Sequence, residues 1–378
     1  MTTTPERTPS DLTSPRTIPL WIGTYPHAGP DQGVGTGEGV WRVDVDPRTG
    51  ALSGARRVVE VGSPSFVALH PSGRTLYAVT EVQDGALTAY AVDAAGETLA
   101  EHPDPVLPTG GAYPCHVVAA GDAVRVANYG SGTVARIPVD DGGAVTGEAR
   151  VDQHAGSGPV TDRQEGPHAH FVGAVGDEWW AADLGADRLV RYAADGAPIG
   201  EVEMPAGSGP RHFVVVDGAV LVACELDPAV VVVSLGDGAA AEPEVVARYD
   251  VTRAPAPVDG ANYPSHVALS ADGRRVFVAV RGADVVASFE VVAADDAPVT
   301  LVHLGDAPIG GAWPRHFAVV AAQGDELDGA DVAADVLVVA NQTSGNLATL
   351  RVDRASGEAE LLASLDLPSP ACVLVGRG

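Results

Sequence analysis

The strongest constraint on the fold of this 378-residue chain is a proline that precedes a short apolar segment seven times. The intervals between these prolines range from 43 to 56 residues and average 51. The seven are Pro64, Pro114, Pro167, Pro210, Pro264, Pro314 and Pro370. A period of this length indicates a solenoid, a propeller or a related array, in which each repeat is one supersecondary unit.

Each repeat contains four strand patterns separated by turn residues. In the fifth repeat, Pro264 opens the apolar segment PSHVAL, and the Asp272-Gly273 turn leads to a second segment, VFVAVR. A third segment, DVVASFEVV, and a weaker fourth one complete the repeat. Valine-rich runs favour strands, and Gly and Pro favour the turns between them. Four short strands in each repeat describe the blade of a β-propeller.

The two ends of the sequence complement each other. Pro370 opens a first strand, and three strand patterns without a proline-led partner lie near the N-terminus, at residues 19–25, 39–46 and 55–61. We therefore predict an all-β fold, a seven-bladed β-propeller with four antiparallel strands per blade, whose last blade joins N- and C-terminal strands. Such a join removes free sheet edges. The single domain is predicted to span residues 17–378, after a disordered Thr-, Pro- and Ser-rich lead-in at residues 1–16.

The composition excludes several classes of function. The formal net charge is −27, so the surface repels nucleic acids and anionic membranes. All 23 basic residues are arginine, which excludes Schiff-base catalysis by lysine and a P-loop lysine. The longest apolar run, Ala229–Val233, is too short to span a bilayer, and the N-terminus has no secretory signal pattern. We expect a cytoplasmic monomer or weak homo-oligomer that binds a small anionic substrate.

No cofactor and no metal are expected. The three cysteines, Cys115, Cys224 and Cys372, lie in apolar strand patterns and are predicted to be small buried hydrophobic residues. An acidic insertion at residues 323–335 leaves Ca²⁺ binding open as an alternative, but it lacks the spacing of a calcium loop.

Candidate site residues follow from the geometry of a four-stranded meander. The start of its first strand and the end of its second lie at the same end of the blade, so these positions from all blades converge on one mouth of the central channel. Polar residues that break the repeat there are the candidates for catalysis: His168, Arg211, Glu225 and Arg281. Further candidates for substrate contacts are His170, His212, Arg315, His316, Asn128 and Asn341.

Two of these groups also have a structural interpretation. Histidine recurs at one place in four repeats, as His116, His212, His266 and His316, which favours a hydrogen-bonded latch between blades. The asparagines Asn128 and Asn341 end second strands, where their side chains can satisfy the backbone of a turn.

The motifs PSFVALHPSGRTLYAVTE, YPSHVALSADGRRVFVAVRG, GPHAHFV and GPRHFVV resemble those of the seven-bladed lactonase family, which contains propeller-type 6-phosphogluconolactonases and fungal carboxymuconate cyclases. The resemblance extends from Trp21 to Val375. It implies a site formed by a histidine, two arginines and a glutamate, at positions that match His168, Arg211, Glu225 and Arg281. The surrounding segments ACEL and AVRG differ slightly from the usual NEL and ANR.

The chemistry of these four residues fits the opening of a lactone. Two arginines can hold a carboxylate or phosphate, or stabilise an oxyanion as water attacks the carbonyl. Glu225 or His168 could take the proton from that water, and an unperturbed histidine is the better-matched base near neutral pH. We expect a lactonase for a small anionic sugar lactone such as 6-phosphogluconolactone. A carboxymuconate-lactonising enzyme and a propeller scaffold without catalytic activity are the alternatives.

Overall fold

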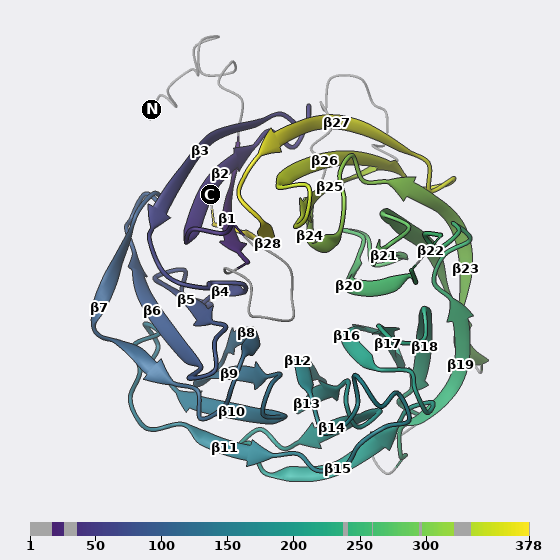
Figure 1. The fold of residues 1–378 in the computed structure, drawn as a ribbon, viewed down its shortest axis with the longest axis horizontal. Coiled ribbons are helices and arrows are strands. Elements are labelled where there is room, and N and C mark those ends of the chain that lie inside the picture. Colours follow the sequence, from purple (N-terminus) through teal and green to yellow (C-terminus); the bar gives the residue numbers. More distant parts are fainter. Residues whose placement is uncertain are drawn as a thin grey trace, which may run out of the picture.

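The structure is a computed structural model that describes residues 17–25, 36–236, 241–258, 260–294, 297–320 and 334–377. All its regular elements are strands, which form seven sheets of four antiparallel strands each. The sheets stand around a central channel like the blades of a propeller, as predicted (Figure 1). Blades are numbered from the one that contains β4. The predicted lead-in at residues 1–16 and most of the acidic insertion lie outside the described residues.

Every blade has the same order of strands from the channel outward (Figure 1). The innermost strands are β4 (Val67–Leu69), β8 (Pro114–Ala120), β12 (Ala169–Val175), β16 (Pro210–Val216), β20 (Tyr263–Leu269), β24 (Pro314–Val320) and β28 (Pro370–Val375). The second strands are β5 (Thr75–Thr80), β9 (Ala123–Asn128), β13 (Glu178–Asp183), β17 (Ala219–Cys224), β21 (Arg275–Arg281), β25 (Ala334–Asn341) and β1 (Ile18–Thr24).

The outer half of each blade is built in the same way. The third strands are β6 (Ala86–Val92), β10 (Thr133–Pro138), β14 (Arg188–Tyr192), β18 (Ala229–Ser234), β22 (Val285–Ala294), β26 (Asn346–Asp353) and β2 (Val40–Val45). The outermost strands are β7 (Leu99–Pro108), β11 (Arg150–Gln153), β15 (Pro198–Glu203), β19 (Glu244–Asp250), β23 (Ala297–Pro308), β27 (Ala359–Asp366) and β3 (Leu52–Val59).

The ring closes where β28 pairs with β1. These strands are antiparallel, and Trp21 lies opposite Leu374. The seventh blade therefore consists of β28, β1, β2 and β3, which confirms the predicted join of the two ends of the chain.

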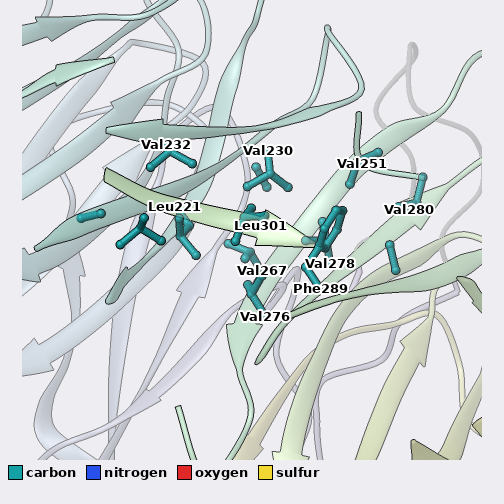
Figure 2. Packing of buried hydrophobic residues seen from close by; sticks show 14 of the residues in the cluster. Leu221, Val230, Val232, Val251, Val267, Val276, Val278, Val280, Phe289 and Leu301 are labelled. Atoms are coloured by element: carbon teal, nitrogen blue, oxygen red, sulfur yellow. The ribbon is translucent and has the colours of Figure 1, made fainter. Parts of the chain in front are cut away.

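The core lies between the blades, because both faces of each inner sheet are covered by a neighbouring blade. In β17, Leu221 packs towards the fifth blade, together with Val278 and Phe289 (Figure 2). The next residue, Val222, packs on the opposite face with Trp180 of the third blade. All six side chains of β17 are buried, whereas those of the outermost strand β19 are all exposed or half-buried. This burial explains the unbroken apolar runs of the second strands, which a sheet with one solvated face would not show.

Candidate active site

A bulge near the start of the innermost strands presents one side chain from several blades to the channel mouth. In the fourth blade, Pro210 pairs with Cys224 and His212 pairs with Ala223, so Arg211 is skipped by the pairing. The same irregularity occurs in the second, third and sixth blades, at Cys115, His170 and Arg315. These four side chains line one cavity of about 550 Å³. β-Bulges commonly occur beside active sites, where they change the direction in which a side chain points.

A second ring of side chains comes from the point where the second strands end. There the backbone N–H of Glu225 donates to the Gly209 carbonyl at 2.8 Å, and the N–H of Glu81 donates to the Ser63 carbonyl at 3.0 Å. This ring supplies six residues of the cavity lining, Tyr25, Glu81, Tyr129, Glu225, Arg281 and Gln342. The two rings meet at one mouth of the channel, as the meander geometry predicts.

The buried Glu225 lies at the centre of a cluster of three arginines, of which Arg211 and Arg281 are buried and Arg163 is half-exposed. Its carboxylate accepts from Arg211 Nε at 2.7 Å, and its oxygens lie 2.6 Å from Nη2 of Arg281 and 2.6 Å from Nη2 of Arg163. Burial acts to raise the pKa of Glu225, but Arg281, Arg211 and Arg163 more than offset burial and hold that pKa well below its ordinary value. Glu225 is therefore a fixed negative charge and a poor proton acceptor at neutral pH.

The arginines of this cluster remain cations. Burial and the neighbouring Arg281 lower the pKa of Arg211 to about 9, which still leaves its guanidinium protonated at pH 7. A further hydrogen bond from Arg211 Nη1 to the Ser265 carbonyl holds it against the fifth blade. Together with Arg315, four guanidinium groups line a cavity in a protein whose formal net charge is −27.

The opposite side of the cavity holds a second buried carboxylate, Glu81. It accepts hydrogen bonds from the hydroxyls of Ser65 and Tyr25, the latter at 3.4 Å, and Arg315 Nη2 lies 3.9 Å away. The Arg315 guanidinium also lies over the Tyr25 ring, 4.3 Å from its centroid. Burial, assisted by Glu81, raises the pKa of Tyr25, so its hydroxyl stays protonated and can donate.

Of the ten residues proposed from the sequence, five line the cavity: His170, Arg211, Glu225, Arg281 and Arg315. His168 lies beside the cavity and is absent from its lining, because β12 begins at Ala169, two residues after Pro167. His170, rather than His168, thereby occupies the bulged position. The Nδ1 of His168 lies 2.9 Å from the Tyr129 carbonyl and its Nε2 lies 3.2 Å from Glu165 Oε1, so both ring nitrogens face acceptors. This placement disfavours His168 as the base.

The four recurrent histidines form contacts between blades, as the structural interpretation predicted. His116 Nδ1 accepts from the N–H of Val172 in the next blade, and His316 Nδ1 accepts from the N–H of Val373 in the next. His212 and His266, also from adjacent blades, share a hydrogen bond of 3.0 Å between their Nδ1 atoms. His212 and His316 therefore hold the ring together and are not part of the cavity lining.

Asn128 and Asn341 likewise serve the backbone. Their side-chain amides donate to the carbonyls of Thr109 and Ile309, each at 3.3 Å. Neither residue is part of the cavity lining, and their observed contacts fit the structural interpretation.

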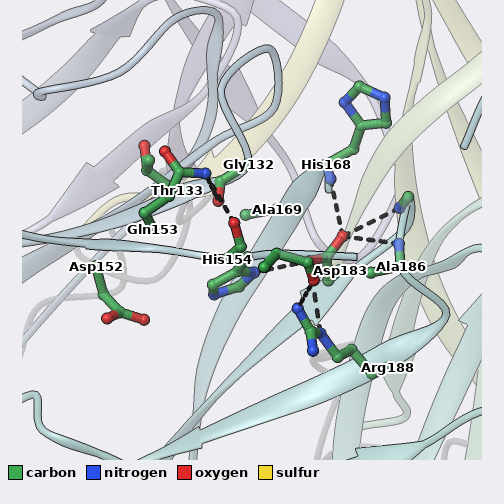
Figure 3. A network of polar contacts seen from close by, with 12 residues as sticks. Gly132, Thr133, Asp152, Gln153, His154, His168, Ala169, Asp183, Ala186 and Arg188 are labelled. Carbon is green, nitrogen blue, oxygen red and sulfur yellow. Dashed lines mark hydrogen bonds and ion pairs between the residues drawn. The ribbon is translucent and has the colours of Figure 1, made fainter. Parts of the chain in front are cut away.

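Arg163 was not identified from the sequence, because it lies in the loop of residues 154–168 and belongs to no repeated position. The carboxylate of Asp183 holds both ends of this loop (Figure 3). Its Oδ2 lies 2.8 Å from His154 Nδ1, and its Oδ1 accepts from the backbone N–H of His168 at 2.8 Å. Gln164, fully buried in the middle of the loop, donates to the Leu184 carbonyl at 2.9 Å. An arginine in a long polar loop before an innermost strand is the signal that could have marked Arg163.

Replacing Asp183 with asparagine is expected to loosen this loop. The change removes charge-assisted hydrogen bonds to buried groups, each worth about 1.5–3 kcal/mol. Trypsin should then cut faster after Arg163, whose guanidinium is held by Glu225 in the native protein. Asp195→Asn, in an exposed turn of the same blade, is the matched control. Equal cleavage rates at Arg163 in both variants would contradict the anchoring role of Asp183.

The described residues hold no group of three or more His, Cys, Asp or Glu side chains placed to bind a metal ion. No helix in the described parts of the chain is long and apolar enough to cross a membrane.

Asp335, from the end of the acidic insertion, is buried and pairs with Arg354 at 2.9 Å. All three cysteines are buried and free, as predicted.

Comparison with known proteins gives one consistent result. The family model described as lactonase, 7-bladed beta-propeller, matches residues 19–375. The chain is 30% identical to the 6-phosphogluconolactonase of Bacillus subtilis, over 93% of this chain and 97% of that protein. It is 25% identical to the 6-phosphogluconolactonase of Formosa agariphila, over 91% and 95% of the two chains. The solved structure of the periplasmic gluconolactonase of Pseudomonas aeruginosa superposes with a TM-score of 0.78 at 27% identity, over 96% of this chain and 99% of that one.

Proposed function

Because the chain belongs to the seven-bladed β-propeller lactonase family, we propose that it hydrolyses the δ-lactone of a small anionic sugar acid, with 6-phosphogluconolactone the leading substrate. The observation that carries this proposal is the cavity at the channel mouth, where four arginines surround two carboxylates. Lactone hydrolysis needs a site for the anionic group, stabilisation of an oxyanion and a base for water. The cavity offers side chains for each of these tasks.

The arginine cluster is the proposed binding site for the anionic group. Within the described residues, Arg163 reaches Glu225 and Tyr129 through its Nη2 atom, so its remaining N–H groups are available to a ligand. Guanidinium groups bind phosphate and carboxylate oxygens in a planar, bidentate fashion. The aromatic side chains of Tyr263 and Trp313, which also line the cavity beside Arg281, offer apolar faces to a sugar ring.

Two lactones test the proposal. Purified protein at pH 7, in the presence of a chelator, should open 6-phosphogluconolactone faster than the spontaneous rate. The unphosphorylated gluconolactone should be a poorer substrate, with a higher KM. Absence of acceleration with both lactones would refute the proposal, and equal KM values would refute the phosphate preference.

Arg163→Ala is expected to raise the KM for 6-phosphogluconolactone about 10- to 100-fold, because one charge-assisted contact is worth about 1.5–3 kcal/mol. Its effect on kcat should be smaller, since the anionic group does not react. Steady-state kinetics measure both values. Arg57→Ala removes a half-exposed arginine that pairs with Glu38 and Glu60 on the outer surface, and it should leave KM unchanged. A KM for Arg163→Ala within twofold of the native value would contradict this role.

A further inference from the structure

Two carboxylates at equivalent positions of the repeat face one cavity from opposite blades. Glu81 follows β5 of the first blade and Glu225 follows β17 of the fourth, and each N–H donates to the carbonyl of the residue before the repeat proline, Ser63 or Gly209. The two blades stand across the channel from each other (Figure 1). The repeat thus places the same functional group on both sides of the cavity, and the neighbouring side chains distinguish them.

The surroundings of Glu81 suit a group that exchanges protons. Glu225 is held by three guanidinium groups within 2.7 Å, whereas Arg315, the guanidinium paired with Glu81, is 3.9 Å away. The hydrogen bonds of Glu81 come from two neutral hydroxyls, those of Ser65 and Tyr25. They fix the orientation of the carboxylate without the charge neutralisation that Glu225 receives. A general base must be held in place and yet remain able to accept a proton.

We propose that Glu81 is the general base of the reaction, with Ser65 and Tyr25 as positioning residues and Glu225 as the organiser of the arginine cluster. This inference rests on the proposed lactonase function. It assigns the proton transfer to the first blade and the binding of the anionic group to the fourth and fifth blades together with Arg163 of the 154–168 loop.

The reaction then balances as follows. Glu81 takes a proton from water as the water oxygen bonds to the lactone carbonyl carbon, and the carbonyl oxygen becomes an oxyanion. Arg315, beside Glu81 and over Tyr25, is placed to stabilise that negative charge. The bond from this carbon to the ring oxygen breaks, and the proton on Glu81 passes to the leaving oxygen to form a hydroxyl. The products are the open hydroxy acid as its carboxylate and one proton released to solvent.

The test is a kinetic comparison of Glu81→Gln with the native protein. Loss of a general base typically reduces the rate about 10²- to 10⁴-fold, so kcat should fall by that factor with KM changed only a few-fold. Glu60→Gln, which removes an exposed carboxylate, is the matched control and should retain native kinetics. A kcat for Glu81→Gln within threefold of the native value would overturn the inference while leaving the lactonase function intact. An inactive native protein would overturn both.

Tyr25→Phe provides a second measurement that does not depend on the folding of Glu81→Gln. It removes a hydroxyl that donates to the Glu81 carboxylate and keeps the ring beneath Arg315. Because this hydrogen bond orients the Glu81 carboxylate, its loss should lower kcat while KM changes little. An unchanged kcat in a folded Tyr25→Phe variant would contradict the assignment.

Discussion

Replacing Glu225 with glutamine should lower the free energy of unfolding by about 3–5 kcal/mol, the typical cost of removing one partner from a buried ion pair. The substitution keeps the size of the side chain but leaves three arginines without their shared counter-ion. Arg211 and Arg281 are only 2% and 6% exposed, so water cannot replace the lost negative charge. Urea unfolding followed by tryptophan fluorescence measures the change, and lactone hydrolysis should be lost as the cluster rearranges.

Two comparisons separate this effect from a general loss of charge. Glu60→Gln removes an exposed carboxylate that also pairs with an arginine, and the unfolding midpoint should hardly change because exposed ion pairs contribute little. Combining Glu225→Gln with Arg211→Met removes one of the stranded cations and should recover part of the lost stability. A Glu225→Gln variant as stable as the native protein would mean that Glu225 does not organise the cluster.

A steep loss of stability between pH 6.5 and pH 5 is the second large effect expected. Five histidines surround the channel, of which His116, His170, His212 and His316 are buried and His266 is half-buried. Burial, reinforced by Arg211, lowers the pKa of each, and that of His316 falls to about 3. The unfolded chain binds these protons near pH 6.5 and the folded chain does not. The stabilisation is therefore fully present above about pH 6.5. Below that pH, the free energy of unfolding decreases by about 1.4 kcal/mol per histidine for each unit by which the pH is lowered.

Together the five histidines amount to at most about 7 kcal/mol for each pH unit, which is comparable to the whole stability of many domains. Carboxylates contribute at lower pH, since the pKa of Glu225 is lowered and its stabilisation is lost only as the pH falls below about 4.3. The free energy of unfolding, measured in urea at several pH values, should therefore decrease as the pH is lowered. The slope of this decrease should correspond to the uptake of several protons on unfolding. His316→Gln should reduce this slope by about one proton, whereas His102→Gln, outside the channel, should not. A slope near zero between pH 5 and 6 would contradict the prediction.

Most of the fold could be predicted from the sequence, because each blade of a propeller is one repeat and the sequence therefore shows a regular period. The seven prolines mark the innermost strands, and the turn residues divide each repeat into four strands. The unpaired strand at Pro370 and the three N-terminal strands indicate how the ring closes. These signals are local in the chain, so no knowledge of distant contacts was needed to interpret them.

The third blade shows where the pattern misleads. Pro167 resembles the other repeat prolines, yet the strand begins at Ala169, so that His170 and not His168 occupies the bulged position and lines the cavity. A register of this kind depends on which residues pair across the blade, which the period alone does not specify.

By itself, the sequence determined the seven-bladed ring, the mouth at which the cavity lies, and four charged residues that line it, Arg211, Glu225, Arg281 and Arg315. Only the tertiary structure decided which side chains meet at this mouth. It brought Arg163 from a long loop to Glu225, and it set Glu81 with Tyr25 and Ser65 on the opposite side of the cavity. The physical reason is that the repeat fixes the backbone path of each blade. The role of a charged side chain depends instead on the charges that neighbouring blades place around it.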